Sequence, residues 1–396
     1  MRKLAILLIF TVFTLSVFGQ TETETVAKAN DLIANKKYES AFKLLCDFDP
    51  SDEKPEIVLL KENIALNFFV TSIMHQMFSF KDLDKNENIM DYRGKNGSFE
   101  IQKFEIDKVL ENLVKNFPNN CKLYKGLADF YYEVHLKYGG EWLKSDNELF
   151  KLIEANNEKV MSGNCADYLT YYVMGYITIS QEKFKEGIPY LLKSIELNKD
   201  FASSYYNVAY AFLFSNERER ALQYAKVSFD LYTDMSYKSD AARMVGQIYT
   251  ELNDEKNALA YYELADKIDP GNYYNLKPLL YLYIKSDSPK VMETTKSFFN
   301  LAPTKPTIYN DLEEIFFSSK REDDLSAFYK EQLPVFKENE NVLGNLFFYL
   351  GKNYIASDRK VAKEYFLQAK NTFRKVFDKD HQVFRAIEEG IAETEK

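Results

Sequence analysis

Glycine and proline are scarce in this chain, with 14 Gly and 10 Pro among 396 residues. A β-sandwich or β-barrel needs turn residues about every 8–12 positions, so this scarcity favours helices joined by short loops. Histidine and cysteine are rarer still, at three residues each, and no His-x-x-x-His or Cys-x-x-Cys spacing occurs. The sequence therefore predicts no metal site.

Basic residues are too few to coat nucleic acid. The chain has 51 Lys and Arg against 60 Asp and Glu, which gives a formal net charge of −9. Because binding to a duplex depends on clustered positive charge, we expect no nucleic-acid partner. The sequence also contains neither a Gly-x-Ser-x-Gly elbow nor a glycine-rich phosphate loop. We predict no catalytic residues, no cofactor and no enzymatic activity.

The long apolar run of the chain lies at its N-terminus. Arg2 and Lys3 precede the apolar stretch Leu4–Phe18, and Val17 and Gly19 supply small or permissive residues for a cleavage site. This pattern is typical of a signal peptide, here residues 1–19. The alternative is an uncleaved membrane anchor, which needs about 20 apolar residues, more than the stretch Leu4–Phe18 provides. We expect an exported protein, periplasmic, envelope-associated or secreted, with no stable membrane insertion after signal removal.

Beyond the apolar run, the sequence repeats at a spacing of 34 residues. The segments Tyr168–Lys199 and Ala202–Thr233 begin 34 residues apart, and Ser239–Pro270 follows them. Such a period is typical of a helical hairpin that buries its apolar face by stacking on its neighbours. In the third segment the recurring small, large and turn positions hold Val245, Gly246, Tyr249, Ala258, Tyr262, Ala265 and Pro270.

These seven residues match seven of eight positions of the tetratricopeptide repeat pattern, with Ala242 in place of the first aromatic, and the chain resembles that family. The resemblance implies an all-α fold: a right-handed helical-repeat solenoid, or TPR-like superhelix, of about seven helix pairs. In such a repeat Gly246 lets helix A approach helix B closely, while large residues fill the gap beside it.

The period also predicts how the chain is divided. Residues 20–120 carry degenerate helical repeats with a long insertion near 79–103, residues 121–375 form the solenoid, and residues 376–396 form a capping helix. We expect no sheet larger than a hairpin, with a turn at Asn96–Gly97. Pro278 falls inside a predicted helix, where it should kink the helix or mark its start.

Asp82-x-Asp84-x-Asn86 resembles the opening of a calcium-binding loop. The sixth position of such a loop needs Gly and the twelfth a bidentate Glu, but this sequence has Glu87 and Arg93 there. We therefore interpret the segment as a solvated acidic loop.

Two cysteines, Cys121 and Cys165, lie near the starts of consecutive predicted helices A. Stacked repeats would bring these helix starts together, and an exported protein meets an oxidising environment. A disulfide between them would close a loop of about 44 residues. The alternative is that both are buried free thiols.

The resemblance also implies where a partner binds. In tetratricopeptide repeats helix A lines the concave surface, chiefly through its second, fifth, ninth and twelfth positions. These positions include Tyr172 and Tyr176 in one repeat and Tyr206 and Tyr210 in the next. Residues four apart share one helical face, so stacking would align both pairs into a ladder. The predicted groove further includes Leu169, Asn207, Leu213, Arg243 and Gln247.

Tyrosine offers contact area with little side-chain entropy to lose, which favours binding, but these rings could also merely pack against neighbouring helices. Asn207 matches one residue of the family's carboxylate clamp, whereas Tyr172 and Tyr176 replace its Lys and Asn. We therefore do not expect capture of an acidic tail.

Two functions follow as hypotheses. The first is an exported, non-enzymatic scaffold or adaptor that binds a protein or peptide in the concave groove. The second is a protein that binds a small ligand or glycan. A broad trough favours the first, and a pocket with converging polar groups favours the second.

Overall fold

The computed structural model describes residues 21–95, 97, 99–139 and 142–396. The predicted signal peptide, residues 1–19, and Asn96 of the predicted hairpin turn lie outside these ranges. The chain divides into two compact units, Met1–Glu182 and Lys183–Lys396. The predicted boundary after residue 120 falls inside the first unit.

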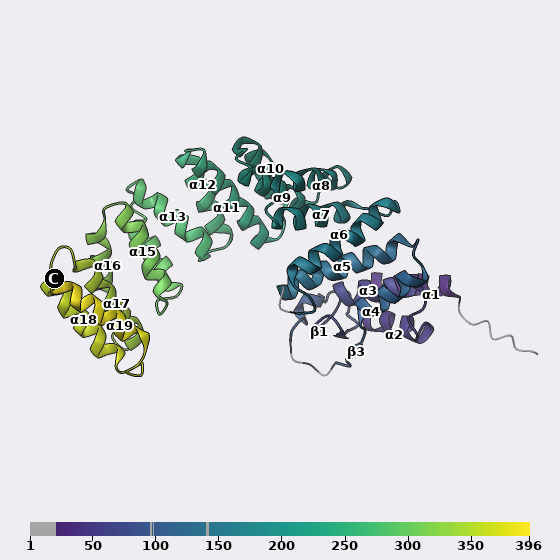
Figure 1. The fold of residues 1–396 in the computed structure, drawn as a ribbon, viewed down its shortest axis with the longest axis horizontal. Helices are drawn as coiled ribbons and strands as arrows, with labels where there is room; N and C mark the ends of the chain where they lie inside the picture. Colours follow the sequence, from purple (N-terminus) through teal and green to yellow (C-terminus); the bar gives the residue numbers. More distant parts are fainter. Residues whose placement is uncertain (1–20, 96, 98, 140–141) are drawn as a thin grey trace, which may run out of the picture. The chain divides into compact units, whose positions relative to one another are not determined.

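Two helices of the first unit, α1 (Glu22–Ala34) and α6 (Asp146–Ser162), begin at capping boxes. Thr21 with Glu24, and Ser145 with Glu148, form capping boxes that satisfy the first backbone N–H groups of their helices. The helices (Figure 1) are α1 (Glu22–Ala34), α2 (Tyr38–Phe48), α3 (Pro55–Asn67), α4 (Ile106–Asn116), α5 (Cys121–Tyr138), α6 (Asp146–Ser162) and α7 (Tyr168–Ser180).

The described part of the second unit consists of the helices α8 to α19 (Figure 1). Helix α13 runs through Pro278, so this proline does not mark a helix start. The helices are α8 (Phe184–Leu197), α9 (Ala202–Phe214), α10 (Arg218–Leu231), α11 (Met235–Glu251), α12 (Glu255–Ile268), α13 (Tyr273–Lys285), α14 (Val291–Asn300), α15 (Pro306–Ser318), α16 (Glu322–Val335), α17 (Glu340–Tyr354), α18 (Arg359–Phe373) and α19 (Gln382–Thr394).

The predicted all-α helical-repeat fold is confirmed. The described residues contain nineteen α-helices, which in chain order make nine pairs and a final helix, where about seven pairs were predicted. Gly246 shows the packing rule, because a Cβ added there would lie 3.2 Å from the buried Tyr262 ring. Gly351 shows the same close approach, because a Cβ added there would lie 2.9 Å from the Phe366 ring. A small residue on helix A thus lets an aromatic ring of helix B fill the gap.

The strands that follow α3 form more than a hairpin. β1 (Thr71–Ile73), β2 (Met77–Ser79) and β3 (Gln102–Lys103) make a three-stranded antiparallel sheet in that order. The prediction of at most a hairpin is wrong, because strands of two or three residues are too short to show an alternating pattern. The β1–β2 turn buries His75, and this burial lowers the pKa of the imidazole to about 4.

A disulfide joins Cys121, at the start of α5, to Cys165, just before α7. Their Cα atoms are 6.0 Å apart, within the range of about 4.4–6.8 Å that a disulfide spans. The bond ties the beginning of α5 to the segment that enters α7. Cys46 is a free cysteine.

Candidate functional site

In the first unit the predicted groove residues lie on α7. The rings of Tyr172 and Tyr176 have centroids 6.3 Å apart, and Tyr176 meets Tyr132 of α5 edge-on at 5.5 Å. These rings and Leu169 are half-buried. Burial raises the pKa of Tyr176, and burial followed by the proximity of Tyr172 raises that of Tyr132. The tyrosines therefore pack against α5 and also contribute to the surface.

His135 of α5 holds Tyr176 in place. Its Nδ1 lies 2.8 Å from Asp146 Oδ1, and its Nε2 lies 3.4 Å from the Tyr176 hydroxyl. Because an ionised carboxylate only accepts, Nδ1 donates to Asp146, and Nε2 faces the Tyr176 hydroxyl. The raised pKa of Tyr176 disfavours its use as a nucleophile. These contacts connect α7 to α5 and to the start of α6.

Sequence reasoning missed Tyr132 and His135, although the signal for one of them was present. Counting Tyr124 as the fourth position of its repeat places Tyr132 at the twelfth, one of the positions that line the concave surface. No periodic rule singles out His135, because its partner Asp146 follows the loop after α5.

In the second unit, α9 and α11 bring predicted groove residues together. Tyr206 is half-buried; burial raises its pKa, and the positive charge of Arg243 opposes that shift. Arg243 Nη2 donates to Asp240 Oδ1 at 2.8 Å, and the guanidinium carbon lies 5.6 Å from the centroid of the Tyr274 ring. Tyr210 packs on Phe214 at 4.5 Å. Side chains from α9, α11 and α13 therefore form one row.

The remaining predicted positions of this unit differ in exposure. Asn207 and Gln247 are half-buried. Leu213 is only 7% exposed, so its assignment to the groove is wrong. It lies one turn after the buried Ala209 and shares that residue's core-facing side of α9. Tyr274 was missed, although it is 65% exposed, because its repeat is too degenerate to set the register.

A hollow of about 420 Å³ lies between α13 and α15. Lys277 contributes to it and pairs with Asp311 at 2.6 Å and with Glu314 at 3.2 Å. Charges along this surface are thus compensated within the protein. The hollow is lined by Lys277, Pro278, Tyr281, Glu314, Ile315 and Ser318.

The two predicted tyrosine pairs belong to different units. Tyr172 and Tyr176 lie in the first unit, and Tyr206 and Tyr210 lie in the second. Each pair occupies the surface of its own unit, and the alignment of both pairs into one ladder stays a prediction.

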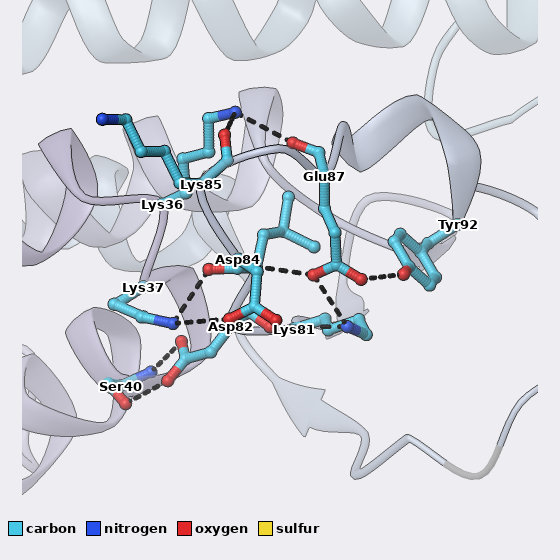
Figure 2. Close-up of polar contacts among 10 residues, drawn as sticks. Lys36, Lys37, Ser40, Lys81, Asp82, Asp84, Lys85, Glu87 and Tyr92 are labelled. Atoms are coloured by element: carbon cyan, nitrogen blue, oxygen red, sulfur yellow. Dashed lines mark hydrogen bonds and ion pairs between the residues drawn. The ribbon is translucent and has the colours of Figure 1, made fainter.

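Asp82, from the segment that resembles a calcium loop, caps a helix. Figure 2 shows its carboxylate accepting from the Ser40 backbone N–H at 3.1 Å and from the Ser40 hydroxyl at 2.5 Å. Helix α2 needs this cap because its own N-cap residue, Lys37, makes no side-chain cap. Asp84 stays exposed, as expected of a solvated loop.

Lysine side chains donate hydrogen bonds to backbone carbonyl oxygens of the same segment (Figure 2). Lys37 Nζ donates to the Leu83 carbonyl at 2.8 Å, and Lys36 Nζ donates to the carbonyls of Lys85 and Glu87 at 3.0 and 2.9 Å. Across residues 21–95, 97, 99–139 and 142–396, no three His, Cys, Asp or Glu side chains are grouped to hold a metal ion. The segment is a loop held by hydrogen bonds from Lys36 and Lys37.

Glu62 of α3 is a buried carboxyl group beside α5. Glu62 is only 5% exposed, and its Oε1 has no hydrogen-bond partner among the described residues. A Cβ at Gly126 would lie 2.6 Å from Oε2, so the two helices are in close contact there. Burial, reinforced by Asp129 and opposed by Lys125, raises the pKa of Glu62 well above its usual range.

We predict that Glu62→Gln stabilises the first unit at alkaline pH. Because the folded pKa of Glu62 is raised, the folded state binds a proton that the unfolded chain has lost above about pH 4.3, so stability falls as pH rises. The amide stays neutral and should add about 1–3 kcal/mol to the free energy of unfolding at pH 8. Urea unfolding at pH 5 and pH 8 measures this.

The exposed Glu154→Gln on α6 serves as the control and should leave the pH dependence unchanged. An equal loss of stability between pH 5 and pH 8 in Glu62→Gln and the parent would contradict the assignment.

Comparison with known proteins identifies two repeat segments, one that crosses the boundary between the units and one in the second unit. The tetratricopeptide repeat family model matches residues 168–201 and 244–272. No curated protein sequence matches the chain. In the part of the chain that the structure describes, none of the helices has the length and apolar character needed to cross a membrane.

The chain is similar, at low sequence identity, to several solved structures. A tetratricopeptide repeat protein from Parabacteroides merdae ATCC 43184 has 16% identity and a TM-score of 0.42, with 69% of this chain and 99% of that chain covered. The C-terminal part of a TPR repeat-containing protein from Cytophaga hutchinsonii has 17% identity and a TM-score of 0.42, with coverage of 72% and 93%. MamA from Desulfovibrio magneticus RS-1 has 14% identity and a TM-score of 0.37, with coverage of 46% and 92%.

Proposed function

We propose that this chain, which belongs to the tetratricopeptide repeat family, is an exported scaffold or adaptor that binds a protein or peptide on the concave face of its helices A. The observation that carries the proposal is the row over α9, α11 and α13. There Tyr206, Arg243 and Tyr274 lie together with parts of their side chains accessible. Aromatic and arginine side chains of this kind dominate the binding energy of protein interfaces.

The chemistry of the row suits an extended peptide. Tyrosine and arginine supply large contact surfaces, and the tyrosine hydroxyls remain available to hydrogen-bond in a wet interface. The charges of Arg243 and Lys277 are already neutralised by Asp240, Asp311 and Glu314. The bound segment therefore needs no strong charge of its own at these places.

Export is supported by two features. Residues 1–19 have the sequence of a signal peptide, and the Cys121–Cys165 disulfide is of a kind that persists in oxidising compartments. Labelling of free thiols in protein from its native compartment tests this part of the proposal.

We expect Tyr206→Ala combined with Tyr210→Ala to reduce partner recovery at least tenfold, because both substitutions remove anchor area from the row. A photo-crosslinking residue placed at Tyr274 should capture the same partner, which mass spectrometry then identifies. Recovery is compared with the parent in affinity capture from the native compartment.

The matched control is Tyr190→Ala combined with Tyr224→Ala, which removes two half-buried tyrosines from helices α8 and α10. These lie on helices B and should leave recovery unchanged. Equal recovery from both double variants, with the helical circular dichroism intact, would show that the helix A surface is not the binding face.

A further inference from the structure

A second hollow, of about 680 Å³, lies near the C-terminal end of the second unit. It is separate from the row over α9, α11 and α13, and its walls come from the start of α15, from α17, from the end of α18 with the following loop, and from α19. This volume is within the range of about 300–1,000 Å³ that is typical of small-molecule sites. The hollow therefore has the size of a ligand site.

One side of the hollow is aromatic. Phe348 and Phe377 are partly accessible, and Phe373 behind them is buried. The Phe377 ring stacks on the imidazole of His381, with centroids 4.1 Å apart and planes within 10°. Because His381 Nδ1 also accepts from the Val383 backbone N–H at 3.2 Å, the start of α19 fixes this wall. An apolar or aromatic body can lie against it.

The other side is polar. Asn345 of α17 is buried and donates its Nδ2 to the Thr304 carbonyl at 3.2 Å, while its Oδ1 has no partner among the described residues. Tyr349 is likewise engaged, since its hydroxyl lies 2.8 Å from Asn310 Oδ1. The polar wall is thus fixed by its own hydrogen bonds and keeps one amide oxygen for a ligand donor.

The charge of the rim is positive. Arg385 is paired with Glu389 at 3.0 Å, so these two charges cancel. Lys305, at the start of α15, makes no ion pair with any residue that the structure describes. One uncompensated ammonium group therefore faces solvent at the edge of an aromatic hollow.

We propose that this hollow binds a small aromatic carboxylic acid, whose ring lies against Phe348 and Phe377 and whose carboxylate pairs with Lys305. Such a ligand matches the aromatic wall, the single unpaired cation and the volume at the same time. The site is distinct from the proposed peptide surface, so each can fail without the other.

The test uses 8-anilinonaphthalene-1-sulfonate, an aromatic anion that fluoresces in apolar surroundings, with the purified protein. We expect saturable binding at one site and displacement by 4-phenylbutyrate. The neutral 4-phenylbutanamide should compete at least tenfold more weakly, because it cannot pair with Lys305. Absence of saturable binding, or equal competition by acid and amide, overturns the proposal.

Two variants and one control locate the site. Lys305→Glu should weaken displacement by 4-phenylbutyrate at least tenfold, and Ala386→Trp should abolish probe binding by filling the hollow from an exposed position of α19. Lys296→Glu on α14 makes the same charge change outside the hollow and should bind as the parent does. Unchanged binding in both Lys305→Glu and Ala386→Trp overturns the proposal.

Discussion

Replacing Cys121 and Cys165 together with alanine is expected to lower the free energy of unfolding of the first unit by about 4 kcal/mol. The bond closes a loop of 44 residues, and loss of that closure restores chain entropy to the unfolded state. Chemical denaturation followed by circular dichroism, with and without reductant, measures the change.

Cys46→Ala is the control for the same experiment, because Cys46 is free. We expect it to cost no more than about 1 kcal/mol and to keep the parent's sensitivity to reductant. The reduced parent should unfold at the same denaturant concentration as the double variant. A double variant as stable as the oxidised parent would contradict the prediction.

Phe366→Ala is expected to destabilise the second unit by about 3–5 kcal/mol. The ring is fully buried on α18 between two glycines: a Cβ at Gly351 of α17 would lie 2.9 Å from it, and one at Gly390 of α19 would lie 2.6 Å from it. Three helices therefore close around this ring, and its removal leaves a cavity that they cannot easily refill. Urea unfolding measures the loss.

A double-mutant cycle sharpens this experiment. Gly351→Ala alone should cost about 1–3 kcal/mol by overpacking, but much less in the Phe366→Ala background, where the methyl group has room. Phe317→Ala, at a ring that is 39% exposed on α15, is the control and should cost under about 1 kcal/mol. Strict additivity of Gly351→Ala and Phe366→Ala would contradict the contact.

The helical repeats could be predicted because their contacts are local and recur. Gly246 and Tyr262 are sixteen residues apart in one repeat, and their contact needs only a small residue and an aromatic one at fixed spacing. The same spacing rule placed Tyr172, Tyr176, Tyr206 and Tyr210 on helices A. Had it been extended to the repeat that begins near Cys121, it would also have selected Tyr132.

Contacts between residues without a periodic relation depended on the tertiary structure. Asp82 caps α2 by accepting a hydrogen bond from Ser40, which lies 42 residues earlier. His135 is hydrogen-bonded to Asp146, which follows the loop after α5. The short strands β1 to β3 carry no alternating pattern long enough to detect. Glu62 is a glutamate on a helix, a residue type that usually faces solvent, although here it is buried. In each case an interaction partner, rather than a spacing, determines the role of the residue.

Periodicity alone was enough to predict that the chain forms stacked helical hairpins, because each hairpin must repeat the same small and large residues to bury its apolar face. Which side chains remain accessible was decided by packing. Leu213 and Tyr274 illustrate this, since the predicted groove residue is buried and the residue that was passed over is the more exposed. The hollow beside α19 likewise arises only where α15, α17 and α19 meet, because its walls come from segments far apart in the chain.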